Sequence, residues 1–283
     1  MNEAVFEQIK AGLAAGEVVP FIGAEALADV SHATKGIKIP ATSDELILSL
    51  NNGQPMAPRL MYEFPRAAMN VELKRGRSAV NRWLEQTYGD NGWSEAGMHR
   101  WLTEQKLPYI VDINRDTGLQ KLYAGRPHTL IVGVARIAGT AFRYKLYKYD
   151  GEKYSGAVDE SEIDPNAPIL FKPCGTPWPE GNWIASDADF VDYITELMGG
   201  FAIPGFLKTR RVGLKYLVAG MRLNRDTQRM LLSDIMFSAA QPSGWALIPG
   251  ANDKEKRFCA RLGLTVIDAD LRDLAGLPVA ETA

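Results

Sequence analysis

The stretch Val18-Val19-Pro20-Phe21-Ile22-Gly23 decides the fold of this chain. An uninterrupted apolar run that ends in a glycine turn is typical of a strand buried on both faces, as in a parallel sheet. The segment before it, residues 2–16, has Val5, Ile9 and Leu13 at helical spacing and ends on a glycine, which predicts a first helix. A helix followed by a buried strand that opens into a loop is the beginning of an α/β arrangement.

Later apolar runs continue this pattern, and each ends in a polar or glycine-containing turn. The runs are Tyr109–Ile113, Tyr216–Gly220 and Leu264–Asp268. With helix signals between them, they predict an α/β, Rossmann-like fold with a mostly parallel sheet. Carboxyl ends of parallel strands share one edge of a sheet, so we expect the loops that follow Ile22, Ile113 and Gly220 to lie close together.

Residues 42–104 are predicted to be mainly helical and to form an insertion over the strand ends. Thr42 and Glu45 have the spacing of a capping box, and the helix behind them is expected to end at Asn51-Asn52-Gly53. One long amphipathic helix is predicted further on by four residues that share a face: Leu73, Val80, Leu84 and Tyr88. Large side chains expected to be buried in the insertion are Trp83, Leu84 and Trp101.

The middle of the chain, about residues 144–168, is polar and acidic. Its acidic side chains are Asp159, Glu160, Glu162 and Asp164. Such a segment predicts an exposed excursion, either a loop or a β-hairpin. With this excursion and the helical insertion, residues 1–283 are predicted to form a single Rossmann-like domain.

Charge and hydropathy narrow the classes of partner. The formal net charge of -2 gives no basic excess for binding nucleic acid or an anionic membrane surface. No apolar run approaches the length that spans a bilayer, and the first residues are acidic where a signal peptide would be basic. We therefore expect a cytoplasmic protein that binds neither nucleic acid nor membrane.

The residues that bind metals in proteins are sparse. Cys174 and Cys259 cannot form a structural zinc site by themselves, and His32, His99 and His128 show no metal-ligand spacing. We expect no bound metal and two reduced thiols.

Several short motifs follow one another along the chain. Gly23-Ala24-Glu25-Ala26-Leu27 comes directly after the first strand, and Ile113-Asn114-Arg115-Asp116 comes after the second. The others are Tyr62-Glu63, Gly76-Arg77, His99–Leu102, Lys172-Pro173-Cys174-Gly175, Ser186–Phe190 and Gly220–Asp226. In order and separation these motifs resemble those of the bacterial branch of the sirtuin family, over about residues 4–273.

This resemblance implies a fold, a cofactor and a chemistry. Sirtuin-like domains bind NAD at the carboxyl ends of the strands and cleave the bond between nicotinamide and ribose. Some members transfer the ADP-ribosyl group to an acyl-lysine, and others hydrolyse NAD, often in defence against phage. The cofactor-binding residues that the resemblance implies are Gly23, Ala24, Glu25, Gly220, Met221 and Arg222. In the catalytic positions it places Asn114, which anchors the ribose and the water, and Asp116, which fixes the turn of Asn114.

Three residues depart from the family pattern at this pocket. Cys174 stands at the position of the histidine base, and a thiol with a pKa of about 8.5 cannot replace an imidazole of about 6.5. Glu25 replaces a glycine that leaves room and free amides for a diphosphate. Arg222 replaces a small serine. We therefore predict a binding or interaction module for an NAD-related nucleotide or a protein partner, without NAD-cleaving activity.

Other hypotheses stay open from the sequence. An active NAD hydrolase or ADP-ribosyl transferase would need a base from outside these motifs, and a reactive Cys174 would need a cation such as Lys172 beside it. A protein deacylase would need the four-cysteine zinc module of larger family members, which this sequence lacks. Asn114 and Asp116 could act only as turn caps. By analogy with the family, the chain could form a homo-oligomer.

The substitutions at Glu25 and Arg222 also predict a specific contact. A carboxylate in a partly buried cleft is costly unless it is paired. We expect Glu25 to form a direct or water-bridged ion pair with Arg222, or else with Arg115, where the phosphates of a dinucleotide would lie. In the alternative, Arg222 binds an anionic ligand and Glu25 turns to solvent.

Overall fold

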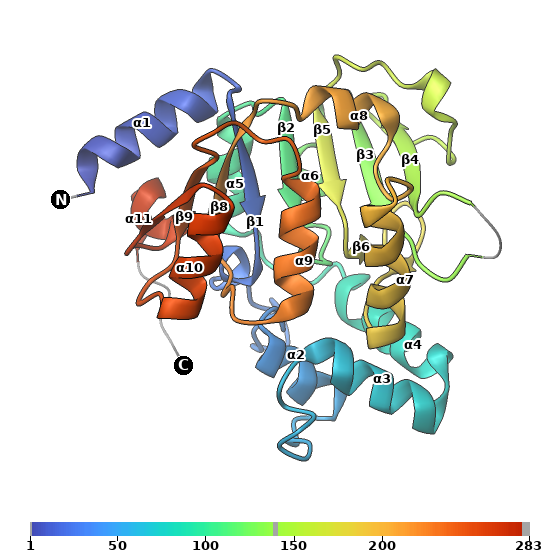
Figure 1. The fold of residues 1–283 in the computed structure, drawn as a ribbon. Helices are drawn as coiled ribbons and strands as arrows, with labels where there is room; N and C mark the ends of the chain where they lie inside the picture. The colour runs from blue at the N-terminus through green and yellow to red at the C-terminus, as the bar shows by residue number, and fades with distance from the viewer. Residues whose placement is uncertain (1, 138–140, 279–283) are drawn as a thin grey trace.

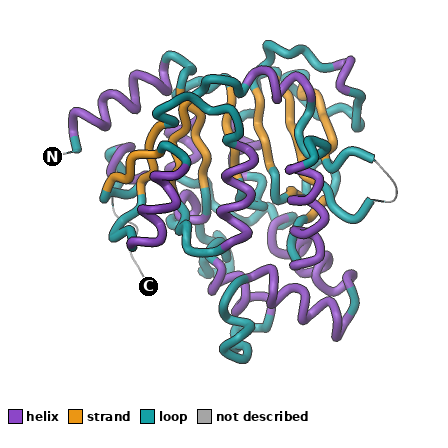
Figure 2. Tube along the Cα trace, in the orientation of Figure 1, coloured by secondary structure: helices purple, strands orange, loops and turns teal. Residues whose placement is uncertain are grey.

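A computed structural model describes residues 2–137 and 141–278, which form an α/β fold around one mostly parallel sheet (Figures 1 and 2). The described strands of this sheet follow the order β10-β9-β8-β1-β2-β5-β3-β4. At its centre, β1 (Val18–Ile22) pairs in parallel with β2 (Tyr109–Asp112) and with β8 (Lys215–Ala219). The remaining strands are β3 (His128–Gly133), β4 (Tyr144–Tyr149), β5 (Ile169–Lys172), β9 (Gly244–Leu247) and β10 (Leu264–Ile267). This arrangement confirms the predicted fold class.

Helices cover both faces of the sheet, because alternate residues of each strand point to opposite sides. Val18 and Ile22 of β1 contribute to the core of one face, and Val19 and Phe21 contribute to the core of the other. The first face is covered by α1 (Glu3–Ala14), α5 (Gly97–Glu104), α6 (Gly118–Leu122) and α11 (Leu271–Ala275). The second is covered by α7 (Asp187–Met198), α8 (Gly205–Arg210), α9 (Asp226–Ile235) and α10 (Asp253–Arg261).

A group of helices with its own core lies at the carboxyl ends of the strands (Figure 1). It contains α2 (Ser43–Leu50), α3 (Phe64–Arg75) and α4 (Arg77–Tyr88). The capping box of Thr42 and Glu45 is present at α2. The prediction of one long helix was wrong, because Gly76 has a φ of 80° and separates α3 from α4. Leu73 precedes this break and is 74% exposed, so it does not share the buried face of α4.

The large side chains of the predicted insertion differ in burial. Leu84 is fully buried, whereas Trp83 and Trp101 are only partly buried. Trp101 lies on α5, which packs against the sheet with α1 and α6 rather than with α2–α4. The helical layer over the strand ends is therefore built by α2, α3 and α4.

The predicted excursion at 144–168 begins with a strand of the main sheet. Residues of β4 pair antiparallel with β3 at the sheet edge, and Tyr154 and Val158 bridge back to β4. Within Tyr144–Tyr149, Leu146 contributes to the core of one face and Tyr147 and Tyr149 to the core of the other, while Lys148 is exposed, which suits an edge strand. A short hairpin of β6 (Gly175–Thr176) and β7 (Asn182–Trp183) follows β5.

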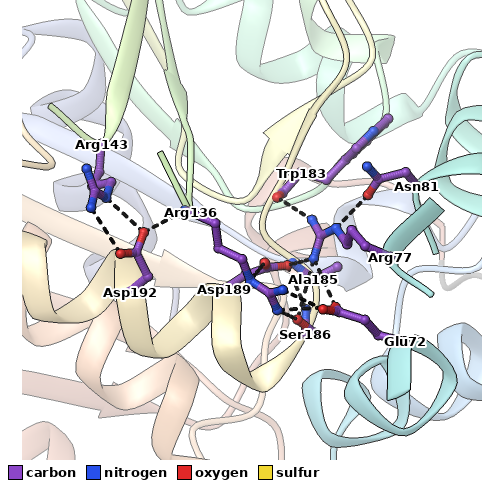
Figure 3. Close-up of polar contacts among 10 residues, drawn as sticks. All are labelled: Glu72, Arg77, Asn81, Arg136, Arg143, Trp183, Ala185, Ser186, Asp189 and Asp192. Atoms are coloured by element: carbon purple, nitrogen blue, oxygen red, sulfur yellow. Dashed lines mark hydrogen bonds and ion pairs between the residues drawn. The ribbon is translucent and has the colours of Figure 1, made fainter. Parts of the chain in front are cut away.

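An ionic network fastens α3 and α4 to α7 (Figure 3). The carboxylate of Asp189 on α7 is almost fully buried and forms ion pairs with Arg77 and with Arg136. Glu72 at the end of α3 forms ion pairs with the same two arginines. Acidic and basic groups therefore alternate across the junction, and their charges balance.

We predict that Asp189→Asn lowers the free energy of unfolding by about 2–3 kcal/mol. Loss of the carboxylate leaves Arg77 and Arg136 with Glu72 as their remaining carboxylate in the network, and this pairing and their partial exposure to water keep the cost below that of a fully buried break. Chemical denaturation measures the change. Asp226→Asn, at a carboxylate on α9 that is 87% exposed, is the matched control and is expected to cost less than about 1 kcal/mol. Equal stability of the Asp189 variant and wild type would contradict the structural role of the network.

Candidate functional site

A cavity of about 270 Å³ lies at the carboxyl ends of β1, β2 and β8. The chain runs from β1 to β2 on one side and from β8 to β9 on the other, so the strand order reverses at β1. Ligands of open α/β sheets bind at such switch points. Residues around α2 and α3, including Tyr62, Glu63 and Phe64, close the cavity from the side opposite the sheet.

Most of the residues implied by the sequence resemblance line this cavity. They are Ala24, Glu25, Asn114, Cys174, Gly220, Met221 and Arg222. The carbonyl of Gly23 accepts a hydrogen bond from Asn114 Nδ2 at 2.9 Å, so Gly23 also belongs to this assembly. Asp116 lies behind Asn114 and is not part of the cavity wall. The parallel sheet thus brings the three predicted loops together as expected.

The backbone of the loop after β1 is occupied by contacts within the protein. Gly23 N donates to Ala219 O at 3.0 Å, and Glu25 N donates to Gly220 O at 3.0 Å. Ala26 N donates to Gly23 O at 3.1 Å. A Cβ at Gly23 would come within 2.7 Å of Gly220 O, so the loop after β1 and the turn after β8 are in direct contact. These three amides are therefore not directed at a ligand, as the amides of a phosphate cradle are.

A chain of buried polar contacts crosses three strand ends. Lys172 Nζ, at the end of β5, is 2.7 Å from Asp112 Oδ2, and both side chains are fully buried. Asp112 Oδ1 accepts hydrogen bonds from Asn114 N and Nδ2, each at 2.9 Å. Asn114 Nδ2 in turn reaches Gly23 O. Asp112 was not predicted as a site residue, and Lys172 was considered only as a possible cation beside Cys174, although a charged residue at the end of an otherwise apolar strand was the signal.

Asp116 stabilises the turn after Asn114. Its Oδ2 accepts from Gly118 N at 2.6 Å, where α6 begins, and its backbone carbonyl accepts from Lys172 Nζ at 2.9 Å. His99 Nδ1 is 4.0 Å from the same carboxylate, and the imidazole is fully buried. Among the described residues, His99, Asp112 and Asp116 offer ligand atoms within 4.8 Å of one another, as a metal ion would require. The ammonium of Lys172 already supplies a cation between the two carboxylates.

Cys174 is a buried thiol in the cavity wall. Burial raises the pKa of this thiol, and the opposing effect of Arg115 and Lys172 is smaller. The ammonium of Lys172 pairs with Asp112 rather than activating the thiol. Cys174 is therefore protonated at neutral pH and cannot act as a general base or a nucleophile. None of the three histidines lines the cavity.

The predicted ion pair of Glu25 with an arginine is absent from the described residues. Arg222 Nη2 is 2.6 Å from Glu255 Oε2, and Arg222 Nε is 3.0 Å from Glu255 Oε1. Arg115 donates to Ile184 O from Nε at 3.2 Å and from Nη2 at 2.5 Å. The prediction of a direct pair was wrong because the fully buried carboxylate of Glu255, at the start of α10, is the competing partner of Arg222.

We predict that both thiols of the folded protein resist alkylation. The pKa of Cys259 is raised by burial to about 11, and that of Cys174 is raised by the same cause. At pH 8 iodoacetamide should modify each at least about tenfold more slowly than in denaturant, because only the thiolate reacts. Peptide mass spectrometry measures both rates, with the denatured chain as the control. Rapid modification of Cys174 in the folded state would favour the reactive-thiolate hypothesis instead.

Among the described residues no helix is long and apolar enough to cross a membrane. In comparisons with known proteins, no family model matches this chain, and no curated protein matches it.

Proposed function

We propose that this protein is a binding module that holds a nucleoside- or nucleotide-type ligand at the ends of β1, β2 and β8 and does not cleave NAD. One observation carries the proposal: a cavity at the switch point of the sheet has a buried, protonated thiol, Cys174, where the sequence resemblance implies a base. The sirtuin-like order of motifs supports a nucleotide-derived ligand, and the lining supports binding without chemistry. A cytoplasmic location is part of this proposal.

The shape and lining of the cavity suit a ring-containing ligand. Four aromatic side chains line it: Tyr62, Phe64, Tyr88 and Phe190. Its volume of about 270 Å³ is near the lower end of ligand pockets, which hold about 300–1,000 Å³. Small-molecule sites combine apolar and aromatic walls with polar groups that orient the ligand, and both kinds of residue line this cavity. A nucleoside or a mononucleotide matches this size better than a whole dinucleotide.

NAD cleavage requires a general base, and the positions at which the resemblance places catalysis do not provide one. A base must remove a proton from water or from a ribose hydroxyl, and Cys174 keeps its own proton at neutral pH. The side-chain nitrogen of Asn114 is committed to Gly23 and Asp112, so this amide serves the scaffold. Loss of a general base alone lowers a rate by about a hundredfold to ten-thousandfold.

An active NAD hydrolase or ADP-ribosyl transferase is the second candidate. Glu25 and Glu63 line the cavity, and burial raises the pKa of both carboxyls, as a substitute base would require. Neither residue belongs to the positions at which the resemblance places catalysis. The assay below separates the two candidates.

We predict no release of nicotinamide from NAD above the rate without protein, measured by chromatography over hours. Nicotinamide release that disappears in Glu25→Gln or Glu63→Gln would establish the second candidate and contradict the first.

We also predict that at least one of adenosine, AMP and ADP-ribose raises the melting temperature. At a concentration about a hundred times Kd the rise should be on the order of 5 °C. Ala41→Trp, which enlarges a side chain of the cavity wall, should abolish the rise. Ala57→Trp, at an exposed position outside the wall, is the matched control and should keep it. Binding that survives Ala41→Trp would place the ligand elsewhere.

A further inference from the structure

The hydrogen-bond donors around the cavity are largely engaged by the protein. The amides of Gly23, Glu25 and Ala26 donate to backbone carbonyls. Arg222 donates to both oxygens of Glu255 and to Pro249 O, and Arg115 donates to Ile184 O. Phosphate sites in proteins are built from free amides at loops and helix ends and from free guanidinium groups. Three loop amides and two of the three arginines of the cavity wall are therefore already engaged within the protein.

The third arginine of the cavity wall is Arg225. Its guanidinium carbon lies 3.9 Å from the centroid of the Tyr62 ring. Its charge also acts on Glu63, whose pKa it lowers against the larger effect of burial. The positive charge of Arg225 therefore already interacts with two groups of the protein, the aromatic face of Tyr62 and the carboxylate of Glu63.

Two carboxylates in the same cavity wall, Glu25 and Glu63, accept few hydrogen bonds from the described residues. Within the described part of the chain, the Glu25 carboxylate has no hydrogen-bond or ion-pair partner. Burial raises its pKa, Asp270 raises it further, and Arg222 lowers it by less. Glu63 accepts one hydrogen bond, from Thr227, and is also buried. A partly desolvated carboxylate gains from each O–H or N–H that a ligand directs at it.

We propose that the ligand of this cavity is a phosphate-free nucleoside, with its ribose hydroxyls donating to Glu25 and its base among the aromatic rings. This inference rests on the proposed function and names its ligand class. Carboxylates of Rossmann-like sites bind ribose hydroxyls in this way. A phosphate at the same place would face the negative charge of Glu25 and would find the amides of Gly23, Glu25 and Ala26 engaged.

Calorimetric titration of the whole chain with adenosine, AMP and ADP-ribose tests this inference. We expect adenosine to bind at least about tenfold more tightly than AMP or ADP-ribose, because like charges in contact disfavour the phosphorylated ligands. Glu25→Gln should weaken adenosine binding by about tenfold, since a charged hydrogen bond becomes a neutral one. The same variant should reduce the preference for adenosine over AMP. Its melting temperature without ligand should not fall, because Glu25 has no partner to lose in the described structure.

Asp270→Asn is the matched control. This substitution removes one negative charge, as Glu25→Gln does, but Asp270 lies outside the cavity wall and acts on Glu25 only through its charge. An asparagine at position 270 can still cap α11. The preference for adenosine should change less than about twofold in this variant. AMP or ADP-ribose binding as tightly as adenosine would overturn the inference and leave the proposed function standing. A preference that Glu25→Gln does not change would overturn the role of Glu25. If none of the three compounds binds, the proposed function fails and the inference fails with it.

Discussion

The buried ion pair of Lys172 with Asp112 is the interaction on which the rest of the site depends. Both side chains are fully buried at the carboxyl ends of β5 and β2, where an unpaired charge would be very costly. Because Lys172 neutralises one oxygen of Asp112, the other is available to hold Asn114. Asn114 then reaches across to Gly23 and places the loop after β1. The contact between the loop after β2 and the loop after β1 thus depends on one pair of charges.

This scaffold resembles a nucleotide site in placement and differs from one in chemistry. The loops meet at the point where the strand order reverses, which is where α/β sheets bind ligands. In the turn after β8, Gly220 O accepts a hydrogen bond from Glu25 N, and Arg222 pairs with Glu255 rather than with Glu25. The amide of Glu25 and the guanidinium of Arg222, which are groups that could bind a diphosphate, therefore form their contacts within the protein. Glu25, which has no hydrogen-bond or ion-pair partner among the described residues, and the buried thiol of Cys174 both line the cavity.

The sequence predicted the parts of this fold that rest on local patterns. The strand at Val18–Ile22 and the capping box at Thr42 were correct, since both depend on neighbouring residues. The break at Gly76 was missed because helical periodicity alone does not show a positive φ. Strands β3, β5 and β9 were not identified, and the last two are short. The meeting of the loops could be predicted because parallel strands end at one edge.

Which carboxylate forms the ion pair with Arg222 could not be predicted in the same way. Arg222 and Glu25 were expected to pair because their loops meet, but Glu255 from α10 competes for the arginine. Asn252 and Glu255 have the spacing of a capping box, which places this carboxylate at the start of a helix and was the one available signal. Nothing in the local sequence shows that this helix start lies beside the turn after β8. Long-range packing decides which of two carboxylates is paired.

Amide hydrogen exchange at Glu25 and Ala26 tests the central claim most directly, because it reports whether the loop after β1 is a closed scaffold or an open phosphate cradle. The structure predicts slow exchange of both amides in the free protein, since Gly220 O and Gly23 O accept them. Addition of ADP-ribose should leave both rates unchanged. Fast exchange in the free protein that becomes slow with ADP-ribose would contradict this account.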